Sequence, residues 1–565
     1  MHPDLKDPLV ERLIGPGKAF ELETVDVFGR PQSVFKGAPR TLCAIYEQAR
    51  RFGPRAMVVQ DDVELTFDEV FAQAAALGKA FRERFGVKLG TKVAVVTSNR
   101  PEWLVSLIAI TAAGGVAALV NSRGVAEEML RAIATAQCEL VILDAGRADI
   151  IAAASPDPPW PRIVIGPAAT PLRAGIDADY ATLAEPSPGL AFEPMAVAPS
   201  DGAIILFTSG TTGFPKGAVL SHGALAHGAK LSEMMGALQD MRYEEELGVK
   251  LAPDRLSMTS PAVILGPMFH LSGMLPSVRA ISVGATIHIM SKWNVDVAFD
   301  LIERIGLSRL GFVPTMLWDM LRSPRAGPST LGAIQYMVNG GASLNPALVA
   351  EIRSQMPRCI ICNTYGQTEM TAWTCSISGA TYVENPDSCG WAVPTVNLQI
   401  RREDGSQADV GERGELWTSS ALLMTEYIGN PEATAEALRD GWCASGDIAF
   451  MDEAGLVTIV DRKKNMVISG GENIYCAEVE RVLFEHPGVR EVVAYGRPDA
   501  RLGERLVVSV VPEPGAELAE EDLKAYCRQH LAIYKVPREI HVRTEALAKT
   551  ASGKIDRGVF ANRPA

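Results

Sequence analysis

The chain has 565 residues, more than one compact core holds, so two or more domains are expected. Hydrophobic residues make up 47% and charged residues 21%, as in ordinary soluble globular proteins. The 54 Lys and Arg stand against 67 Asp and Glu, and the resulting net charge of −13 disfavours a nucleic-acid partner. A nucleotide is not disfavoured, because it needs only a local positive pocket.

The cysteines indicate the cellular compartment, and the apolar stretches show whether a membrane-spanning segment is expected. Nine cysteines with no framework spacing indicate a reducing cytoplasm. Cys359 and Cys362 have redox or metal spacing, but their apolar surroundings favour a core strand. The first residues are charged, so we do not expect them to form a signal peptide. The most apolar stretch, 104–120, is short for a membrane span of about 20 residues, so we expect a buried helix followed by a buried strand.

In chain order, residues 1–38 carry Pro and Gly with little periodicity and are expected to form an irregular arm. Helical and strand patterns then alternate, which predicts a parallel sheet with helices outside it. The pattern predicts helices at 45–51, 67–85, 102–113 and 127–135, and strands at 92–97, 116–120, 140–143, 204–207, 285–289, 310–313 and 335–338.

Later segments differ in texture. Residues 152–190 are rich in Ala, Pro and Asp and are expected to form a surface connection. Strands at 396–401, 414–418 and 456–460 indicate a small β-rich unit. After the charged break at 462–465, helix and strand alternate again over 477–530. We therefore predict an N-terminal domain over 1–461 and a small α+β C-terminal domain over 462–565.

The most informative segment is 207–217, Phe-Thr-Ser-Gly-Thr-Thr-Gly-Phe-Pro-Lys-Gly. Glycines let backbone N–H groups turn toward an anion, and hydroxyls and the lysine add donors, so this loop is suited to phosphates. It is not a Walker loop, because Pro215 stands where a glycine is expected and Gly217 follows the lysine.

Three further motifs follow in order: Asn363 to Glu369 (Asn-Thr-Tyr-Gly-Gln-Thr-Glu), Ser445-Gly446-Asp447, and Lys549 to Lys554 (Lys-Thr-Ala-Ser-Gly-Lys). Together with the loop, they resemble the motifs of the adenylate-forming superfamily, which includes acyl-CoA synthetases, peptide-synthetase adenylation domains and luciferases. The resemblance runs from about residue 40 to 557. It implies a large α/β domain of parallel sheets with a small β-rich subdomain, and a mobile C-terminal domain.

The resemblance most closely implies an AMP-forming acid–CoA ligase. Joining a carboxylate to the α-phosphate of ATP brings two anions together, so the site must supply positive charge. The resemblance assigns this charge to Lys554, Mg²⁺ to Glu369 and the α-phosphate to Thr368. A hard cation such as Mg²⁺ favours carboxylate oxygens. The implied substrates are a carboxylic acid, ATP and CoA, with Mg²⁺ as the metal.

The resemblance also implies the ATP site. By this resemblance, Tyr365 is expected to stack on adenine with Gly341 and Ala342 beside it, and Asp447 and Arg462 are expected to reach the ribose. The residues assigned to ATP are Thr208, Ser209, Gly210, Thr211, Thr212, Gly213, Lys216, Gly341, Ala342, Tyr365, Asp447 and Arg462.

The acid pocket and the CoA path are the remaining implied sites. The block ending in His270 resembles one that gates the acid pocket, so His270 joins Lys554, Thr368 and Glu369 as a catalytic residue. The block lacks the Phe-Asp that binds an α-amino group, which argues against an amino-acid substrate. The expected acid pocket comprises His270, Val313, Gly340, Met370 and Trp373. The expected hinge is Lys464, and the expected CoA tunnel is Gly470, Gly471 and Lys535.

Several alternatives stay open from the sequence. The enzyme can instead load a carrier protein, form a lactone or act as a luciferase-like oxygenase, or the chain can be a non-catalytic nucleotide-binding protein of the same fold. The pocket residues favour a medium-chain, aromatic or alicyclic acid over acetate. A homodimer also stays open, and no transmembrane segment is expected.

Overall fold

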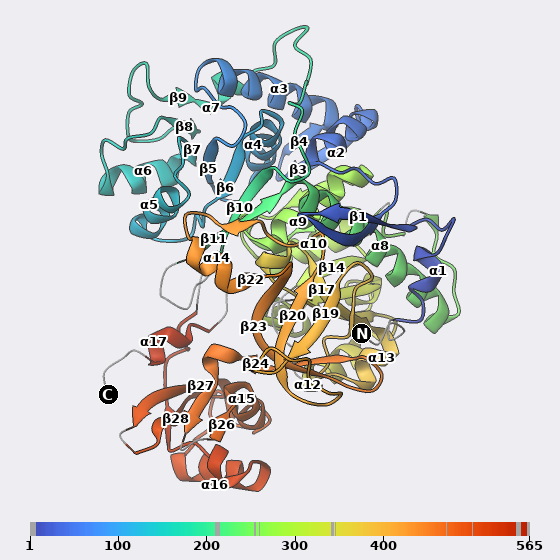
Figure 1. Ribbon diagram of the computed structural model, residues 1–565, viewed down its shortest axis with the longest axis vertical. Helices are drawn as coiled ribbons and strands as arrows, with labels where there is room; N and C mark the ends of the chain where they lie inside the picture. The colour runs from blue at the N-terminus through green and yellow to red at the C-terminus, as the bar shows by residue number, and fades with distance from the viewer. Residues whose placement is uncertain are drawn as a thin grey trace. The chain divides into compact units, whose positions relative to one another are not determined.

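The computed structural model describes residues 7–208, 215–253, 256–258, 260–312, 314–340, 344, 346–469, 472–499, 501–549 and 555–561. Its contacts divide the chain into two compact units, each described by itself (Figure 1). The first unit covers Met1–Gly210, Phe214–Leu398 and Thr418–Cys443, and the second includes Gln399–Trp417 and Ala444–Ala565. The boundary predicted at 461/462 remains a prediction.

The first unit is built around a sheet in the order β21-β11-β10-β6-β5-β7-β8-β9. From β10 to β9 all neighbours are parallel, while β10 with β11 and β11 with β21 are antiparallel. The predicted parallel sheet is thereby confirmed. The strands are β5 (Lys92–Val96), β6 (Val116–Leu119), β7 (Leu140–Asp144), β8 (Arg162–Ile165), β9 (Ala178–Asp179), β10 (Gly202–Thr208), β11 (Lys216–Ser221) and β21 (Glu426–Tyr427).

The same unit contains two further sheets. One has the order β12-β13-β3-β4 and the other the order β14-β15-β16-β17-β18. In the second, β14, β15 and β16 are parallel, and β17 and β18 continue antiparallel. The strands are β3 (Ala56–Gln60), β4 (Val63–Thr66), β12 (Ala262–Ile264), β13 (Ile287–Ile289), β14 (Arg309–Phe312), β15 (Tyr336–Gly340), β16 (Ile360–Gly366), β17 (Trp373–Ser378) and β18 (Trp391–Ala392).

The helices of this unit begin where local capping favours them. The side chain of Thr66 accepts a hydrogen bond from the amide of Glu69, and the Glu69 carboxylate accepts one from the amide of Thr66. This reciprocal pair is a capping box at the start of α3. The long helix α8 begins after the Ser221 cap and ends at Gly248, whose φ of 62° is the left-handed conformation. The helices are α1 (Glu11–Ile14), α2 (Leu42–Ala49), α3 (Phe67–Glu83), α4 (Pro101–Ala112), α5 (Ala126–Thr135), α6 (Ala145–Ala154), α7 (Tyr180–Ala184), α8 (His222–Leu247), α9 (Leu271–Val283), α10 (Val295–Ile305), α11 (Pro314–Arg322), α12 (Pro346–Gln355), α13 (Gly379–Glu384) and α14 (Pro431–Ala437), with short 3₁₀ turns at η1 (Arg50–Phe52), η3 (Leu331–Ala333) and η4 (Thr368–Met370).

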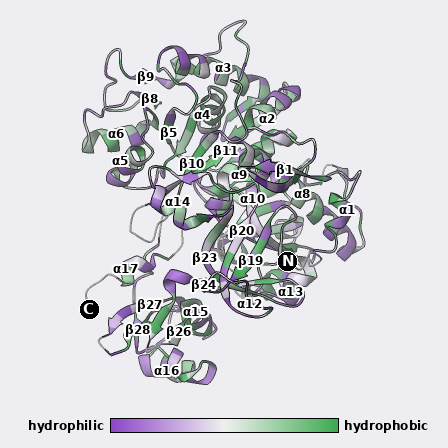
Figure 2. Cartoon of the chain, viewed as in Figure 1, coloured by the Kyte–Doolittle hydropathy of each residue, from purple (hydrophilic) through white to green (hydrophobic). Residues whose placement is uncertain are grey.

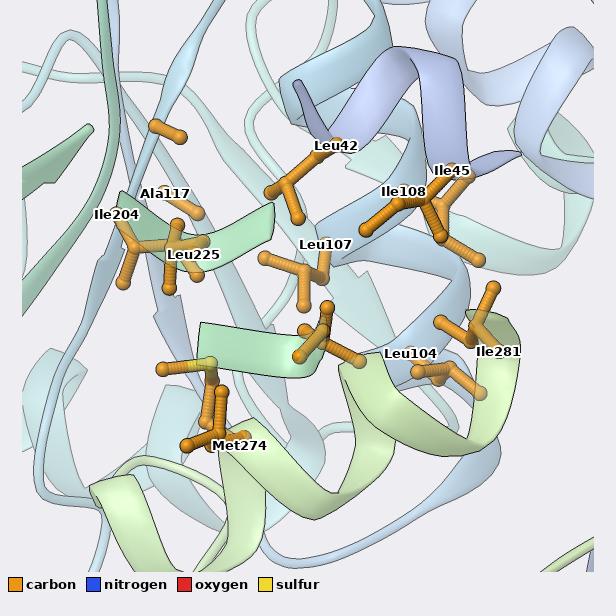
Figure 3. Packing of buried hydrophobic residues seen from close by; sticks show 14 of the residues in the cluster. Leu42, Ile45, Leu104, Leu107, Ile108, Ala117, Ile204, Leu225, Met274 and Ile281 are labelled. Carbon is orange, nitrogen blue, oxygen red and sulfur yellow. The ribbon is translucent and has the colours of Figure 1, made fainter. Parts of the chain in front are cut away.

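The main core lies between the central sheet and helices α2, α4, α8 and α9. Figure 3 shows Leu104, Leu107 and Ile108 of α4 packed among side chains from the other three helices and from strands β6 and β10. Every residue of α4 from Trp103 to Ala112 is buried, as expected for a helix that is apolar on all sides. The buried helix and strand predicted for 104–120 are therefore confirmed. In Figure 2 the strands around this core are mainly green, whereas α16 of the second unit carries purple residues.

The irregular arm predicted for residues 1–38 is wrong, because this segment contains a β-hairpin. Strands β1 (Leu22–Val27) and β2 (Arg30–Phe35) pair antiparallel, with Val27 opposite Arg30. Phe28 and Gly29 form the turn with positive φ values of 52° and 77°. Two-residue turns with positive φ at both positions match the twist of the flanking strands. Phe is rare at a positive φ, so the sequence does not indicate a turn here.

The surface connection predicted for 152–190 is wrong in part, because β8 lies within it and is fully buried. The side chain of Asp177 is 0% exposed and accepts hydrogen bonds from Nη2 of Arg162 at 2.6 Å and from Nη2 of Arg173 at 2.9 Å. This ion cluster holds the loop 166–176 onto the sheet. The Pro- and Asp-rich flanks concealed a strand of only four residues.

The second unit contains two small sheets. One has the order β19-β20-β23-β22 with β24 paired to β23, and the other has the order β26-β25-β28-β27 with β29 paired to β28. The first sheet also includes residues of the first unit. The predicted strands and helices at 396–401, 414–418, 456–460 and 477–530 are confirmed. The elements are β19 (Asn397–Arg401), β20 (Gly414–Ser419), β22 (Leu438–Arg439), β23 (Trp442–Met451), β24 (Val457–Arg462), η5 (Lys463–Asn465), β25 (Val467–Ser469), β26 (Glu472–Ile474), α15 (Cys476–Phe484), β27 (Val489–Asp499), β28 (Gly503–Pro512), α16 (Glu520–His530), η6 (Ile533–Lys535), β29 (Glu539–Val542) and α17 (Arg557–Ala561).

The helices and the thiol of Cys362 bear on the predictions about membrane spans and cysteine chemistry. Within the described part of the chain, no helix has both the length and the apolarity needed to cross a bilayer. Cys362 lies inside the buried strand β16, where burial raises the pKa of its thiol to about 12. A thiol held protonated in this way is a poor nucleophile and metal ligand, in agreement with the core strand predicted there.

Candidate active site

The carboxyl ends of three parallel strands meet at one edge of a sheet in the first unit. Strands β14, β15 and β16 end at Phe312, Gly340 and Gly366. Ligands of open α/β sheets bind at such carboxyl edges. Gly340 and Tyr365, which were predicted to bind the acid and adenine, lie at these ends. Val313, Gly341 and Ala342, predicted on the same loops, lie outside the described residues.

The predicted phosphate loop connects two strands of the central sheet. Thr208 ends β10, Lys216 begins β11, and the two residues are partners in the antiparallel register. Gly217 is needed for packing, since a Cβ there would lie 2.8 Å from the side chain of Ile428 and 2.9 Å from that of Ile205. The loop residues Ser209, Gly210, Thr211, Thr212 and Gly213 lie outside the described residues.

The segment 424–428 joins the phosphate-loop strand to the predicted metal ligand. The amide of Met424 donates to the carbonyl of Glu369 at 2.8 Å, and the amide of Ile428 donates to the carbonyl of Gly217 at 2.8 Å. Between these two points, Tyr427 donates its hydroxyl proton to Oε1 of Glu369 at 2.6 Å. The Nζ of Lys216 lies 5.1 Å from the Tyr427 ring centroid. The structure thus brings Lys216 and Glu369 to the same tyrosine.

Tyr427 is a site residue that the sequence motifs did not indicate. It lies 58 residues beyond Glu369, in the two-residue strand β21, outside the four motifs. A signal was present in the pattern Thr-Glu-Tyr-Ile-Gly-Asn-Pro, where a tyrosine precedes a turn and the helix start at Pro431. That signal gives no indication of which side chain the hydroxyl meets.

The residues around Glu369 fit a magnesium ion that also takes phosphate oxygens. Among the described residues, hydrogen bonds reach only one Glu369 side-chain oxygen, Oε1. No group of three or more His, Cys, Asp or Glu side chains suited to a metal occurs in the described ranges. Mg²⁺ is commonly held by one or two carboxylates together with substrate phosphates and water, so a single half-buried carboxylate is sufficient.

Thr368 and Met370 flank Glu369 in the turn η4 and are both buried. The Nε2 of Gln367, just before this turn, is buried and has no hydrogen-bond partner in the part of the chain that the structure describes. Buried polar atoms are nearly always satisfied in native proteins, so an unsatisfied donor beside the site needs an explanation. A bound nucleotide, which has many acceptor atoms, would explain this donor by accepting a hydrogen bond from it.

The remaining acid-pocket residues belong to different elements of the same unit. Trp373 begins β17 opposite Gly366 and is partly buried against the main core. His270 caps helix α9, with Nδ1 accepting from the Ser272 amide at 3.5 Å. Within the described residues, no hydrogen bond or ring contact links any two of His270, Met370 and Trp373.

The predicted ribose pair lies in the second unit. Asp447 is buried in β23, and its Oδ1 lies 3.0 Å from Nε of Arg462 in β24. The predicted hinge residue Lys464 is exposed in η5, two positions later.

The predicted CoA residues have different surroundings. The Nζ of Lys535 donates to both carboxylate oxygens of Glu478, at 2.6 and 2.7 Å, so its charge is already neutralised. Ser469 pairs with Glu472 as the strands β25 and β26 form a hairpin. Gly470 and Gly471 between them lie outside the described residues.

Lys554 also lies outside the described residues, but both ends of its loop are fixed. Lys549 forms a β-bridge with Ile555, and Glu491 accepts the amide of Leu547 at 2.7 Å and Nζ of Lys549 at 2.8 Å. Burial raises the pKa of Glu491, but Lys549 and the Leu547 amide outweigh it and leave the pKa below its ordinary value.

On the far side of the loop, Arg557 binds Glu480 of α15. Its Nη2 donates to Oε1 of Glu480 at 2.6 Å, and its Nε donates to the carbonyl of Ala494 at 3.0 Å. The segment that carries Lys554 is therefore tied to β27 before the loop and to α15 and β27 after it.

Comparison with known proteins identifies the family. A model described as "AMP-binding enzyme" matches residues 45–428, and one described as "AMP-binding enzyme C-terminal domain" matches residues 478–554. The chain belongs to the AMP-binding enzyme family. The two matches cover three of the four sequence motifs and Tyr427, while Ser445-Gly446-Asp447 lies between the two matched ranges.

Similar proteins of the AMP-binding family include acid–CoA ligases. A feruloyl-CoA synthase of Amycolatopsis sp. is 32% identical over 91% of this chain and 97% of that protein. The long-chain-fatty-acid–CoA ligase FadD13 of Mycobacterium tuberculosis is 30% identical over 87% of this chain and 92% of that protein. The crystal structure of ATP-bound MatB from Rhodopseudomonas palustris is 26% identical with a TM-score of 0.78, over 91% of this chain and 98% of that one. The predicted family, fold class and enzyme class are confirmed.

Proposed function

We propose that this chain activates a carboxylic acid with ATP to acyl-AMP and transfers the acyl group to CoA, giving acyl-CoA, AMP and pyrophosphate. The observation that carries the proposal is the junction at 424–428, which joins the strand after the phosphate loop to Glu369. The feruloyl-CoA synthase and the long-chain-fatty-acid–CoA ligase among its relatives support this reaction over a non-catalytic role.

The reaction has two half-reactions. In the first, a carboxylate oxygen bonds to the α-phosphorus of ATP, and the bond from that phosphorus to the bridging oxygen breaks to release pyrophosphate. In the second, the thiolate sulfur of CoA bonds to the acyl carbon, and AMP leaves with the oxygen that came from the acid. Both steps bring like-charged groups together, so the protein must position them and offset their charge.

The first unit would hold the nucleotide's base and phosphates. We assign the phosphates to Thr208, Lys216 and loop residues 209–213, and adenine to Tyr365 and residues 341–342. Thr368 would contact the α-phosphate. Glu369 would hold magnesium, which when bound offsets the charge of the phosphates.

The second unit would complete the first half-reaction. Asp447 can accept hydrogen bonds from two ribose hydroxyls, and Arg462 fixes its carboxylate. Lys554 would place its charge between the acid and the α-phosphate. Rotation about Lys464 would then bring Gly470 and Gly471 to line the CoA path, since one lysine loop cannot occupy the site while CoA enters. A CoA phosphate would reach Lys535 only by displacing Glu478.

The acid would bind against His270, Gly340, Met370 and Trp373, with Val313 on the adjoining loop. Buried Met370 and partly buried Trp373 are apolar, which favours a medium-chain, aromatic or alicyclic acid over acetate. The reduced state of all nine cysteines supports a cytoplasmic site of action.

A panel of acids tests this proposal. Acetate, octanoate, palmitate, benzoate and cinnamate are each incubated with the protein and Mg-ATP, with and without CoA, and AMP is quantified. We expect AMP to form in excess of enzyme only when CoA and an apolar acid are both present. Acid-dependent pyrophosphate release that stops at about one equivalent of enzyme and is unchanged by CoA would indicate an acceptor absent from the mixture, such as a carrier protein. No acid-dependent pyrophosphate release with any acid would contradict an adenylating enzyme.

A further inference from the structure

Tyr427 contacts two oppositely charged residues that the proposed function assigns to ATP and its metal. Its hydroxyl donates to Oε1 of Glu369 at 2.6 Å, and its ring lies 5.1 Å from Nζ of Lys216, measured to the centroid. The residue is 7% exposed. An ammonium near the face of an aromatic ring is attracted by the ring quadrupole.

The backbone around Tyr427 keeps the side chain in place. Tyr427 pairs with Ala218 of β11, and its amide donates to Oγ1 of Thr434 at 2.9 Å. The amide of Thr425 donates to the carbonyl of Val219 at 2.9 Å. These contacts, with those of Met424 and Ile428, fix the strand β21 on both sides.

Among the described residues, Lys216 and Glu369 form no ion pair with each other or with any other residue. A direct ion pair between them would neutralise the ammonium that the phosphates need and occupy the carboxylate that the metal needs. The phenol gives each group a weaker, neutral partner. Lys216 therefore has no carboxylate partner among the described residues, and Glu369 keeps Oε2 clear of hydrogen bonds from them.

We propose that Tyr427 is a positioning residue that holds Glu369 for the metal with its hydroxyl, holds Lys216 for the phosphates with its ring, and keeps the two from pairing. This inference rests on the proposed function. It assigns a separate task to each part of one side chain, so two substitutions can separate them.

The test is equilibrium binding of Mn²⁺ and α,β-methylene-ATP, which has no cleavable α–β bridge, without acid or CoA. Bound Mn²⁺ is measured by electron paramagnetic resonance, and analogue binding in excess chelator is measured by calorimetry. Tyr427→Phe removes the hydroxyl and keeps the ring. We expect it to weaken Mn²⁺ binding to the analogue complex about tenfold, because hydrogen bonds to charged groups are the stronger ones, and to leave metal-free analogue binding within twofold.

Tyr427→Leu removes both contacts and is expected to weaken both measurements, with metal-free analogue binding reduced several-fold. The matched control is Tyr382→Phe, which removes a buried hydroxyl from helix α13 that has no hydrogen-bond partner among the described residues. The control is expected to bind Mn²⁺ and analogue like the wild type. Thermal unfolding of each variant checks that the fold is retained.

If Tyr427→Phe binds Mn²⁺ as tightly as the wild type and also binds the analogue normally, the inference about Tyr427 is overturned while the proposed function stands. Equal loss of metal-free analogue binding in the Phe and Leu variants would also overturn it, because the ring would then hold nothing by itself. A wild-type protein that fails to bind the analogue would overturn the proposed function and this inference together. If the analogue binds but no acid is activated, the proposed function fails while the metal measurement still decides the role of Tyr427.

Discussion

The Nε of Arg462 lies 3.0 Å from Oδ1 of Asp447, and the two residues are partners in the register of β24 and β23. Asp447 is 3% exposed, whereas the Arg462 side chain is 47% exposed. The amide of Asp447 also donates to Oγ of Ser445 at 3.0 Å. A carboxylate fixed in this way keeps one direction, which suits the pair of ribose hydroxyls that we propose it binds.

Asp447→Asn is expected to raise the KM for ATP by about 10- to 100-fold, because hydrogen bonds to a charged acceptor contribute about 1.5–3 kcal/mol. The KM for the acid should change little. Glu415→Gln is the control, since Glu415 of the neighbouring strand β20 pairs with Lys463 and has no assigned ligand. An unchanged KM for ATP in Asp447→Asn would remove the ribose from this site.

Lys554→Ala is expected to lower the rate of acyl-AMP formation by about 10²- to 10³-fold, as when one aimed electrostatic group is lost. Thioester formation from supplied acyl-AMP should be retained, because the lysine acts before CoA enters. Single-turnover kinetics of each half-reaction measure both rates. Lys524→Ala, a change on helix α16, is the control. Equal loss of both half-reactions in Lys554→Ala would contradict the assignment.

Gly471→Leu should produce the opposite pattern. A branched side chain in the proposed CoA path would block the thiol chain, whereas we propose that adenylation does not use this glycine pair. Acid-dependent pyrophosphate release should therefore persist, and the yield of acyl-CoA should collapse. The persisting first half-reaction is the internal control for folding. Undiminished thioester formation would locate the path of CoA elsewhere.

Asp177→Asn is expected to destabilise the first unit by about 3–5 kcal/mol, because it leaves the buried Arg162 guanidinium without its charge partner. Asp157→Asn is the matched control, since Asp157 pairs with Arg173 but its side chain is 87% exposed. Such exposed pairs contribute about 0–1 kcal/mol. Midpoints of urea unfolding compare the two variants, and equal shifts would contradict the role of burial.

The Asp177 cluster also predicts a pH dependence. Burial alone raises the pKa of Asp177, but hydrogen bonds from Arg173 and Arg162 outweigh it and hold the pKa far below its ordinary value of about 4. The stabilisation is therefore complete above about pH 5 and is lost as pH falls through 4 and below. The difference in unfolding free energy between wild type and Asp177→Asn should narrow between about pH 5 and 3. A difference that stays constant would contradict the depressed pKa.

The parts of the fold that the sequence predicts well are those with one strong period. Residues 104–120 are apolar except for Ser106 and Thr111, so burial of α4 and β6 follows from composition alone. The hairpin at 22–35 was missed because its strands are half polar and its turn places Phe28 at a positive φ. The strand β8 was missed because its four residues are stabilised by Arg162 and Asp177, whose pairing depends on tertiary structure.

The same distinction applies to the candidate site. Glu369 and Lys216 lie in glycine- and hydroxyl-rich motifs whose chemistry can be recognised locally. Tyr427 cannot be recognised in this way, because its hydroxyl meets Glu369 only when β21 pairs with β11. The neutralisation of Lys535 by Glu478, 57 residues earlier, is likewise a contact that spacing does not reveal.

The most direct test of the central claim uses an accepted acid labelled with ¹⁸O in both carboxylate oxygens. The acid is incubated with the protein, Mg-ATP and CoA, and the AMP and pyrophosphate are analysed by mass spectrometry. The account predicts one ¹⁸O in each AMP and none in pyrophosphate, because the acid's oxygen bonds to the α-phosphorus and leaves with AMP. Unlabelled AMP, or label in pyrophosphate or free phosphate, would contradict an acyl-AMP intermediate.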